Sequence, residues 1–375
     1  MDGHNLNEML RTLKNLKSLK GPKLLHLITT KGKGFSPAEK NPIGFHALNK
    51  IETNTKKTNG KKYSKVFGDW LSKKVEEGDD DLVAITPAMS EGSGMNDFAK
   101  ENPDKFYDVA IAEQHSMTFA AGLAKEGKKP ILAIYSTFLQ RAYDQLIHDV
   151  ALQKLDVTLA IDRAGFVGGD GATHAGIFDV SFLRCIPNMI IMSPSDENEC
   201  WKMLSTGYNY SGPAAIRYPR GEGPGTEISK NFDLLEIGKA RVINETSSDL
   251  VIFSFGNMLD LSKEIVNQIN CSLVDMRFIK PLDEELIEKC AKTYKHIITI
   301  EENVITGGAG SAVNEFLTEI GYSEKLKIFG IPDEFPIVGT QVDQRDAAGL
   351  TKNKILESLA SELNLKDLEK KVSAQ

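Results

Sequence analysis

Four segments of the chain place polar or aromatic side chains where an apolar run gives way to a helical pattern. The first is residues 108–115 (DVAIAEQH), in which Glu113 is expected to open a helix of small residues. A carboxyl group at that position is partly buried, so its pKa can rise and it can share a proton with a bound base. Glu113 could instead serve only the start of the helix, and the residues alone leave both interpretations open.

The second segment is residues 135–141 (YSTFLQR), again at the end of an expected strand. Tyr135 and Phe138 could stack on a flat heterocycle, and Arg141 could meet an anion. The alternative is that the two rings are ordinary core aromatics and that Arg141 is a surface residue.

The third and fourth segments are residues 162–176 (DRAGFVGGDGATHAG) and 217–221 (RYPRG). The glycines of the third let the backbone approach a ligand closely, and they accompany an Asp, an Arg and a His. In the fourth segment, Arg217 and Arg220 suit a phosphate or carboxylate through bidentate hydrogen bonds. Salt bridging to the acidic surface is an equally good explanation for these two arginines.

Other apparent sites are rejected. Gly169, Asp170 and Gly171, followed by Asn198, imitate the signature that holds magnesium and the diphosphate of thiamine diphosphate, but Asn198 lies past another expected strand. The histidines lack metal-ligand spacing, so no metal ligands are predicted. The four cysteines form no CxxC pair, which disfavours a zinc site or disulfide framework and fits a reducing cytoplasm.

The elements that must position these segments alternate strands with helices. Apolar runs predict strands at 82–86, 106–111, 130–135, 157–162, 189–193 and 214–218, and then at 250–255, 272–278, 296–300 and 327–331. The clearest helices are predicted at 139–154 and 195–207. This alternation predicts two parallel α/β sheets with helices on both faces, in domains at 63–225 and 226–375. Ligands of such sheets bind beyond the carboxyl ends of the strands.

The first 62 residues differ from the rest. Residues 6–20 read as an amphipathic helix and 24–30 as one strand, and two elements cannot bury a core alone. Residues 1–48 are therefore interpreted as the remnant of another domain, and 49–62 as a polar linker.

Composition narrows the class of protein. The 45 Lys and Arg residues against 52 Asp and Glu give a net charge of −7, which argues against non-specific nucleic-acid binding. No run of 18 apolar residues is present, and the start of the chain has no secretory h-region. We expect a cytoplasmic protein with no membrane partner.

Taken together, the motifs AIAEQH, YSTFLQRAYDQ, IDRAGFVGGDGATHAG, PSDENE and RYPRG resemble the 1-deoxy-D-xylulose-5-phosphate synthase family of the transketolase superfamily. The resemblance extends through DMRFIKPLD and EENVITGGAGS, and back to DGHN and GFHALNK. It implies a transketolase pyrimidine-binding domain and a transketolase C-terminal domain, preceded by a stub of the diphosphate-binding domain.

The resemblance also implies an activity. Family members are transferases and usually homodimers that bind thiamine diphosphate and Mg²⁺. They decarboxylate pyruvate and join its two-carbon unit to D-glyceraldehyde 3-phosphate, feeding isoprenoid, thiamine and pyridoxal synthesis. Glu113 would hydrogen-bond the aminopyrimidine ring and promote its imino tautomer. The resemblance implies that Phe138 stacks on the pyrimidine and that Phe35 replaces a cofactor-contacting Tyr. It implies two further catalytic residues: His46, which lies near the cofactor, and His174 in the substrate pocket. Asp170 and Arg141 also line that pocket, and the phosphate is held by Tyr135, Arg163 and Arg220.

The resemblance leaves alternatives. The family's diphosphate and magnesium ligands belong to a domain of which only a stub is expected here, so this chain alone is expected to be inactive. It could be the β-type subunit of a split transketolase or of a 2-oxo-acid dehydrogenase, or a non-catalytic remnant. A nicotinamide-binding protein is disfavoured because GGAGSA at 307–312 departs from GxGxxG.

Overall fold

The computed structural model describes residues 1–42, 44–45 and 59–363. The chain forms two compact units, Met1–Lys57 and Thr58–Gln375. In the first, α1 (Leu6–Ser18) starts at Asn5, whose side chain accepts the Glu8 N–H, and α2 spans Ser36–Lys40. The strand expected at 24–30 is wrong: among the described residues of this unit there is one bridge, between Asp2 and Ile28, and no second strand for the segment to join.

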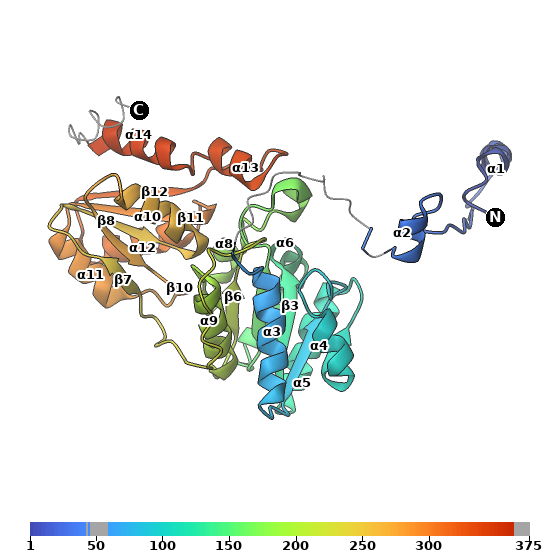
Figure 1. The fold of residues 1–375 in the computed structure, drawn as a ribbon, viewed down its shortest axis with the longest axis horizontal. Helices are drawn as coiled ribbons and strands as arrows, with labels where there is room; N and C mark the ends of the chain where they lie inside the picture. The colour runs from blue at the N-terminus through green and yellow to red at the C-terminus, as the bar shows by residue number, and fades with distance from the viewer. Residues whose placement is uncertain (43, 46–58, 364–375) are drawn as a thin grey trace. The chain divides into compact units, whose positions relative to one another are not determined.

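The first sheet of the second unit has seven strands in the order β10-β5-β6-β4-β3-β1-β2 (Figure 1). Neighbouring strands run parallel, except that β10 is antiparallel to β5. The strand bounds are β1 Leu82–Thr86, β2 Phe106–Asp108, β3 Lys129–Tyr135, β4 Thr158–Asp162, β5 Ile190–Met192, β6 Ala214–Arg217 and β10 Phe278–Lys280. β2 ends earlier than expected because Ala110 takes a left-handed φ of 58°.

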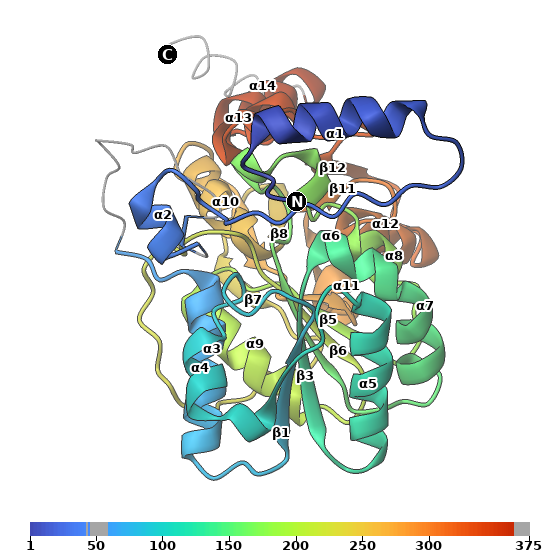
Figure 2. The same ribbon diagram turned by 90° about the vertical axis from the view of Figure 1, so that its right-hand side faces the viewer.

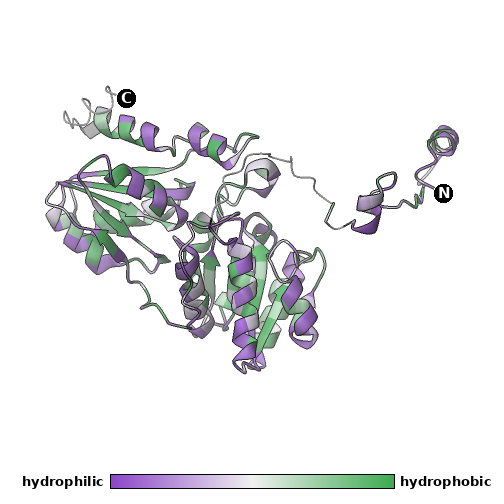
Figure 3. Cartoon of the chain, viewed as in Figure 1, coloured by the Kyte–Doolittle hydropathy of each residue, from purple (hydrophilic) through white to green (hydrophobic). Residues whose placement is uncertain are grey.

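Helices lie on both sides of the first sheet (Figure 2), and alternate side chains of its strands pack toward each side. Val83 and Ile85 pack in the cluster that contains α5 (Glu113–Lys125), whereas Leu82 and Ala84 pack in the cluster of α3 and α9. The strands between the layers are apolar (Figure 3), as expected where both faces are covered. The remaining helix bounds of this domain are α3 Tyr63–Glu76, α4 Asn96–Glu101, α8 Asp179–Leu183 and α9 Glu197–Asn209.

The helix expected at 139–154 is not a regular α-helix. It is divided into α6 (Ser136–Leu139), a 3₁₀ turn, α7 (Tyr143–Gln145) and a π-helical stretch at Leu146–Ala151. Such changes of helical pitch are frequent at functional sites. They turn the segment that carries Arg141 at the carboxyl edge of the sheet.

The second sheet has the order β12-β11-β8-β9-β7, with β7 antiparallel to β9 and the other pairs parallel. The bounds are β7 Arg241–Asn244, β8 Leu250–Ser254, β9 Ser272–Asp275, β11 His296–Val304, β12 Lys325–Ile331, α10 Leu259–Val266, α11 Glu284–Thr293, α12 Ala309–Glu319, α13 Gln341–Ala347 and α14 Lys352–Leu363. The strand expected at 272–278 divides in two because Arg277 takes a φ of 56°. After this break, β10 joins the first sheet.

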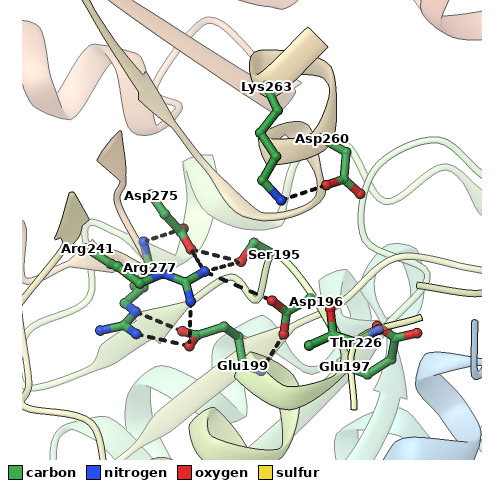
Figure 4. Close-up of polar contacts among 10 residues, drawn as sticks. All are labelled: Ser195, Asp196, Glu197, Glu199, Thr226, Arg241, Asp260, Lys263, Asp275 and Arg277. Atoms are coloured by element: carbon green, nitrogen blue, oxygen red, sulfur yellow. Dashed lines mark hydrogen bonds and ion pairs between the residues drawn. The ribbon is translucent and has the colours of Figure 1, made fainter. Parts of the chain in front are cut away.

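A network of buried charges joins the two domains at the start of α9 (Figure 4). Asp275 is fully buried, accepts a hydrogen bond from the Ser195 hydroxyl at 2.8 Å and pairs with Arg241 at 2.9 Å. Glu199 pairs with Arg277 at 2.7 Å. Burial raises the pKa of Asp275 to about 6, and the charge of Arg241 opposes the rise. The two domains are therefore packed as one unit across a charged seam.

Candidate active site

The predicted site residues of the second unit meet at the carboxyl edge of the first sheet. Strands β2, β3, β4 and β6 all end there, and β3 and β4 are neighbours, as are β4 and β6. Tyr135 is the last residue of β3, and the segments after β2, β4 and β6 carry Glu113, Arg163 and Arg220. The parallel topology thus brings together residues as far apart in the sequence as Glu113 and Arg220.

Glu113 is the first residue of α5, and its side chain makes no capping bond to the helix backbone. It is 4% exposed. Its Oε1 accepts a hydrogen bond from Nη1 of Arg141 at 2.7 Å, and the Arg141 side chain is 55% exposed. Among the described residues, none donates to Oε2. The carboxylate is therefore buried. Its Oε2 is left for a further donor, and its Oε1 is bonded by the mostly exposed side chain of Arg141.

Aromatic rings line the space beside this carboxylate. The half-buried Phe138 ring is stacked on Tyr135, with centroids 5.6 Å apart and planes 9° apart. The edge of His174 meets Phe138 at 5.4 Å, and the guanidinium of Arg141 lies 5.3 Å from the Phe138 centroid. Phe138 thus links the carboxylate group to the glycine-rich loop 164–176.

Tyr135 also contacts a buried ion pair. The guanidinium of Arg163 lies 4.2 Å from the centroid of the Tyr135 ring, and its Nη1 donates to Asp162 and to the carbonyl of Gly92 at 2.6 and 2.7 Å. Burial raises the pKa of Asp162 to about 6, against the charge and hydrogen bonds of Arg163. Burial likewise raises the pKa of the Tyr135 hydroxyl, which keeps it a neutral donor.

Arg220 and Asp170 form a second, more exposed ion pair. The Nε of Arg220 lies 3.2 Å from Asp170, each side chain being about one-third exposed, and Nη1 donates to the carbonyl of Val167 at 2.7 Å. Asn198, the residue rejected as a diphosphate ligand, instead accepts the Ser229 N–H. Within the loop 164–176, Nδ1 of His174 lies 3.0 Å from the Thr173 hydroxyl.

Arg217 lies in the interior rather than in the site. It is 5% exposed and forms a bidentate pair with the fully buried Asp179, at 2.7 and 3.1 Å. Its Nη2 also reaches the carbonyl of Glu302 in the second domain. Arg217 is therefore in a salt bridge, as the alternative expected, but in the interior rather than at the acidic surface, where it joins the two domains.

Two predicted residues belong to the first unit. Phe35 is 52% exposed, and its ring meets the edge of Phe45 at a centroid distance of 5.7 Å. His46 lies outside the described residues.

The second domain also contributes side chains to the site, and none of these was predicted. Gln341 and Gln344 of α13 bond the loop 164–176, and Glu302 at the end of β11 packs against its start. Nothing in the sequence marks Gln341 and Gln344, because isolated polar side chains in a distant domain carry no recognisable spacing. Glu302 lies in the EENVITGGAGS motif, but no role was predicted for it. A cleft of about 500 Å³ lies between the two domains. Its lining includes Arg220 from the domain of the first sheet and Gln341 from the second domain.

The pyrimidine half of a thiamine site fits these residues. A buried carboxylate with a free oxygen can hold a proton on a ring nitrogen, and the Phe138 face can take a flat heterocycle. Within the part of the chain that the structure describes, no group of three or more His, Cys, Asp and Glu side chains is arranged to hold a metal ion. None of the described helices is long and apolar enough to cross a membrane.

Comparison with known families supports the same conclusion. Residues 59–226 match the family described as "Transketolase, pyrimidine binding domain", and residues 238–355 match "Transketolase, C-terminal domain". A split-gene transketolase, solved as an inactive β4 tetramer, superimposes with a TM-score of 0.72 at 29% identity, over 82% of this chain and 99% of that chain. Transketolase from Campylobacter jejuni shares the fold, with a TM-score of 0.68 at 18% identity over 83% of this chain and 48% of its own.

The fold and site therefore define a member of the transketolase superfamily, whose domains imply thiamine diphosphate as the cofactor. 1-Deoxy-D-xylulose-5-phosphate synthases from Pseudoalteromonas translucida and Hahella chejuensis are each 53% identical over 369 residues, which is 97% of this chain. This chain belongs to the 1-deoxy-D-xylulose-5-phosphate synthase family. It spans 59% and 57% of the length of those two relatives.

Proposed function

We propose that this chain provides the pyrimidine-binding and acceptor-binding half of a 1-deoxy-D-xylulose-5-phosphate synthase. The reaction would decarboxylate pyruvate and transfer its two-carbon unit to D-glyceraldehyde 3-phosphate, with a product that feeds isoprenoid, thiamine and pyridoxal synthesis. The observation that carries the proposal is the buried Glu113 carboxylate beside the Phe138 ring, with one oxygen free among the described residues.

In this proposal thiamine diphosphate supplies, when bound, the nucleophilic carbon and the electron sink that decarboxylation requires. Glu113 would share a proton with a ring nitrogen of the aminopyrimidine through Oε2, and Phe138 would support the ring face. Arg141, whose side chain is mostly exposed, can leave Oε1 at the cost of its contact with the Phe138 ring and its hydrogen bond. The protein then controls which nitrogen of the ring carries the proton.

The acceptor would bind on the other side of the aromatic pair. Arg220 is the best-placed phosphate ligand because it is partly exposed and its present partner, Asp170, is also on the surface. Arg163 is more enclosed, and its Nη1 is already used by Asp162 and Gly92. It would therefore contribute positive charge more than a direct contact, while the neutral Tyr135 hydroxyl and His174 would orient the aldehyde.

The remaining expectations are part of the proposal. Mg²⁺ would bind with the diphosphate, on residues outside the pyrimidine-binding and C-terminal domains. The enzyme would act as a homodimer in the cytoplasm, and His46 and Phe35 would lie near the cofactor.

A chimeric enzyme tests the proposal. Residues of this chain replace the corresponding residues of the Pseudoalteromonas translucida synthase, and 1-deoxy-D-xylulose 5-phosphate is measured with thiamine diphosphate, Mg²⁺ and both substrates. We expect turnover by the chimera and none by this chain alone. A folded chimera that binds thiamine diphosphate but releases no product from pyruvate would overturn the proposal.

A second candidate is a subunit of a split transketolase, favoured by the 99% coverage of the split-gene transketolase chain. The same chimera discriminates between the two when pyruvate is replaced by a ketose phosphate donor. Transfer from the ketose phosphate, without use of pyruvate, would favour the split transketolase.

A further inference from the structure

The loop 164–176 carries Asp170 and His174 but has little structure of its own. Its base is closed by one pair of backbone hydrogen bonds between Gly165 and Gly176, at 2.6 and 2.9 Å. Between these ends the loop forms only two short 3₁₀ turns. Its middle must therefore be held from outside if Asp170 is to keep one position.

Helix α13 of the second domain provides that support. The side chain of Gln344, 1% exposed, accepts the Gly168 N–H at 2.8 Å, and its amide nitrogen donates to the carbonyls of Gly168 and Ile337 at 3.4 and 2.9 Å. Gly168 has a φ of +66°, and a Cβ there would lie 3.2 Å from the backbone nitrogen of Gln341. The close approach allowed by this glycine is thus to α13.

Gln341, one turn earlier on α13, bonds both halves of the candidate phosphate site. Its amide nitrogen donates to the carbonyl of Phe166 at 2.7 Å and to that of Arg220 at 3.3 Å. One side chain therefore bridges the loop that carries Asp170 and the segment that carries Arg220. The 3.2 Å ion pair between Asp170 and Arg220 joins the same two segments.

Helix α13 is itself fixed to the second sheet. Thr340 and Asp343 form a capping box at its start, and Arg345 pairs at 2.6 Å with Glu302, which is 1% exposed. A Cβ at Gly165 would lie 2.2 Å from the other oxygen of Glu302, so the loop's first glycine also abuts the second domain. A continuous set of contacts thus runs from β11 through α13 to the loop.

We propose that Gln344 and Gln341 are positioning residues through which the C-terminal domain sets the geometry of the acceptor-phosphate pocket. They hold the main chain at Gly168, Phe166 and Arg220, and so fix where the Asp170 and Arg220 side chains lie. The inference rests on the proposed function for the identity of the ligand, and on the described contacts alone for the support of the loop.

The first test needs no activity. Amide hydrogen exchange of the full chain is compared with that of Gln344→Met, which keeps the side-chain volume but loses the acceptor for the Gly168 N–H. We expect exchange in 166–174 to rise about tenfold, as the loss of one buried hydrogen bond implies, with β4 unchanged. The matched control is Gln153→Met, at an exposed glutamine that bonds the Asp149 carbonyl. Unchanged exchange in the loop would overturn the proposal, as would an equal rise in β4 and β11.

The second test uses the active chimera and Gln341, which is half-buried and therefore tolerates replacement by Met better than the fully buried Gln344. We expect the KM for D-glyceraldehyde 3-phosphate to rise about fivefold to tenfold while the KM for pyruvate stays within twofold. Equal changes in both constants would overturn the positioning role. An inactive wild-type chimera would count against the proposed function, and the exchange result would then decide the loop support by itself.

Discussion

The two domains each bury a glutamate beside the start of a helix, and the two glutamates have different partners. Glu113, 4% exposed, is bonded by the mostly exposed Arg141. Glu301, 2% exposed, accepts the backbone N–H groups of Ala309 and Gly310 at 2.8 and 2.7 Å, at the start of α12. A buried carboxylate is thus available for chemistry only where its partners can move aside.

The same comparison explains why the glycine-rich segment 307–312 is not a phosphate site. A helix start offers N–H groups to an anion, but here the Glu301 carboxylate already occupies them. A Cβ at Gly308 would lie 2.6 Å from that carboxylate, and one at Gly310 would lie 2.5 Å from the Thr299 hydroxyl. The glycines of this segment therefore serve internal packing, which agrees with the rejection of a nicotinamide-binding role.

The comparison is tested most strongly by Glu113→Gln. We expect kcat/KM of the active chimera to fall by roughly 10²–10⁴-fold, because the amide cannot exchange a proton with the pyrimidine. The free energy of unfolding should change by less than about 1 kcal/mol, since only a half-exposed ion pair is lost. The control is Glu126→Gln, at the exposed end of the same helix. Full activity of the Glu113 variant would show that this carboxylate has no catalytic part.

The opposite result is expected for Glu301→Ala. It leaves two N–H groups of α12 buried without an acceptor, and we expect the free energy of unfolding to fall by about 3 kcal/mol. The transition should be measured by far-UV circular dichroism rather than by tryptophan fluorescence. Trp70 and Trp201 both lie in the first domain, so their fluorescence would not report on α12. Glu319→Ala, at an exposed glutamate of the same helix, is the control. A loss no larger than that of the control would contradict the structural role of Glu301.

Glu301 also predicts a pH dependence of stability. Burial raises its pKa to about 7, against the opposing bonds from Gly310 and Ala309, whereas the unfolded chain has the ordinary value of 4.5. The folded protein binds this proton more tightly, so its contribution is full below pH 4.5 and is lost as the pH rises through 7. Between pH 5 and 8 the free energy of unfolding should fall by about 2 kcal/mol more in the wild type than in Glu301→Gln. Denaturant titrations at each pH measure the free energy of unfolding of both proteins. The same dependence on pH in the wild type and in Glu301→Gln would contradict the prediction.

Much of the fold could be predicted because the strands are continuous buried runs. The strand at 82–86 is confirmed residue for residue as β1, and β3 and β4 each differ by one residue. The failures at β2 and at 272–278 coincide with the left-handed Ala110 and Arg277. Residues with a Cβ seldom adopt that conformation, and here the contacts of the tertiary structure impose it, so no local sequence signal existed.

The site was predictable as a set of strand ends, but its internal pairing was not. The sequence placed Arg217 and Arg220 together, yet one lies in the interior and the other on the surface. Likewise the loop glycines Gly165 and Gly168 were expected to approach a ligand, whereas they approach the second domain. Which partner a charged or flexible residue meets depends on the packing of two domains, and the spacing along one chain does not encode it.

The smallest expected effect sharpens the comparison through the two arginines. Arg141→Ala removes a guanidinium that is 55% exposed, so water can replace it at Glu113, and the free energy of unfolding should fall by less than 1 kcal/mol. Arg345→Ala removes a guanidinium that is 30% exposed from the nearly inaccessible Glu302, and we expect a loss of about 2 kcal/mol. The hydrogen bond from Asn257 to Glu302 keeps that loss below the cost of a wholly unpaired charge. Chemical denaturation of both variants decides between these expectations. Equal losses would mean that Arg141 holds Glu113 as firmly as Arg345 holds Glu302, and that Arg141 is a structural partner of Glu113.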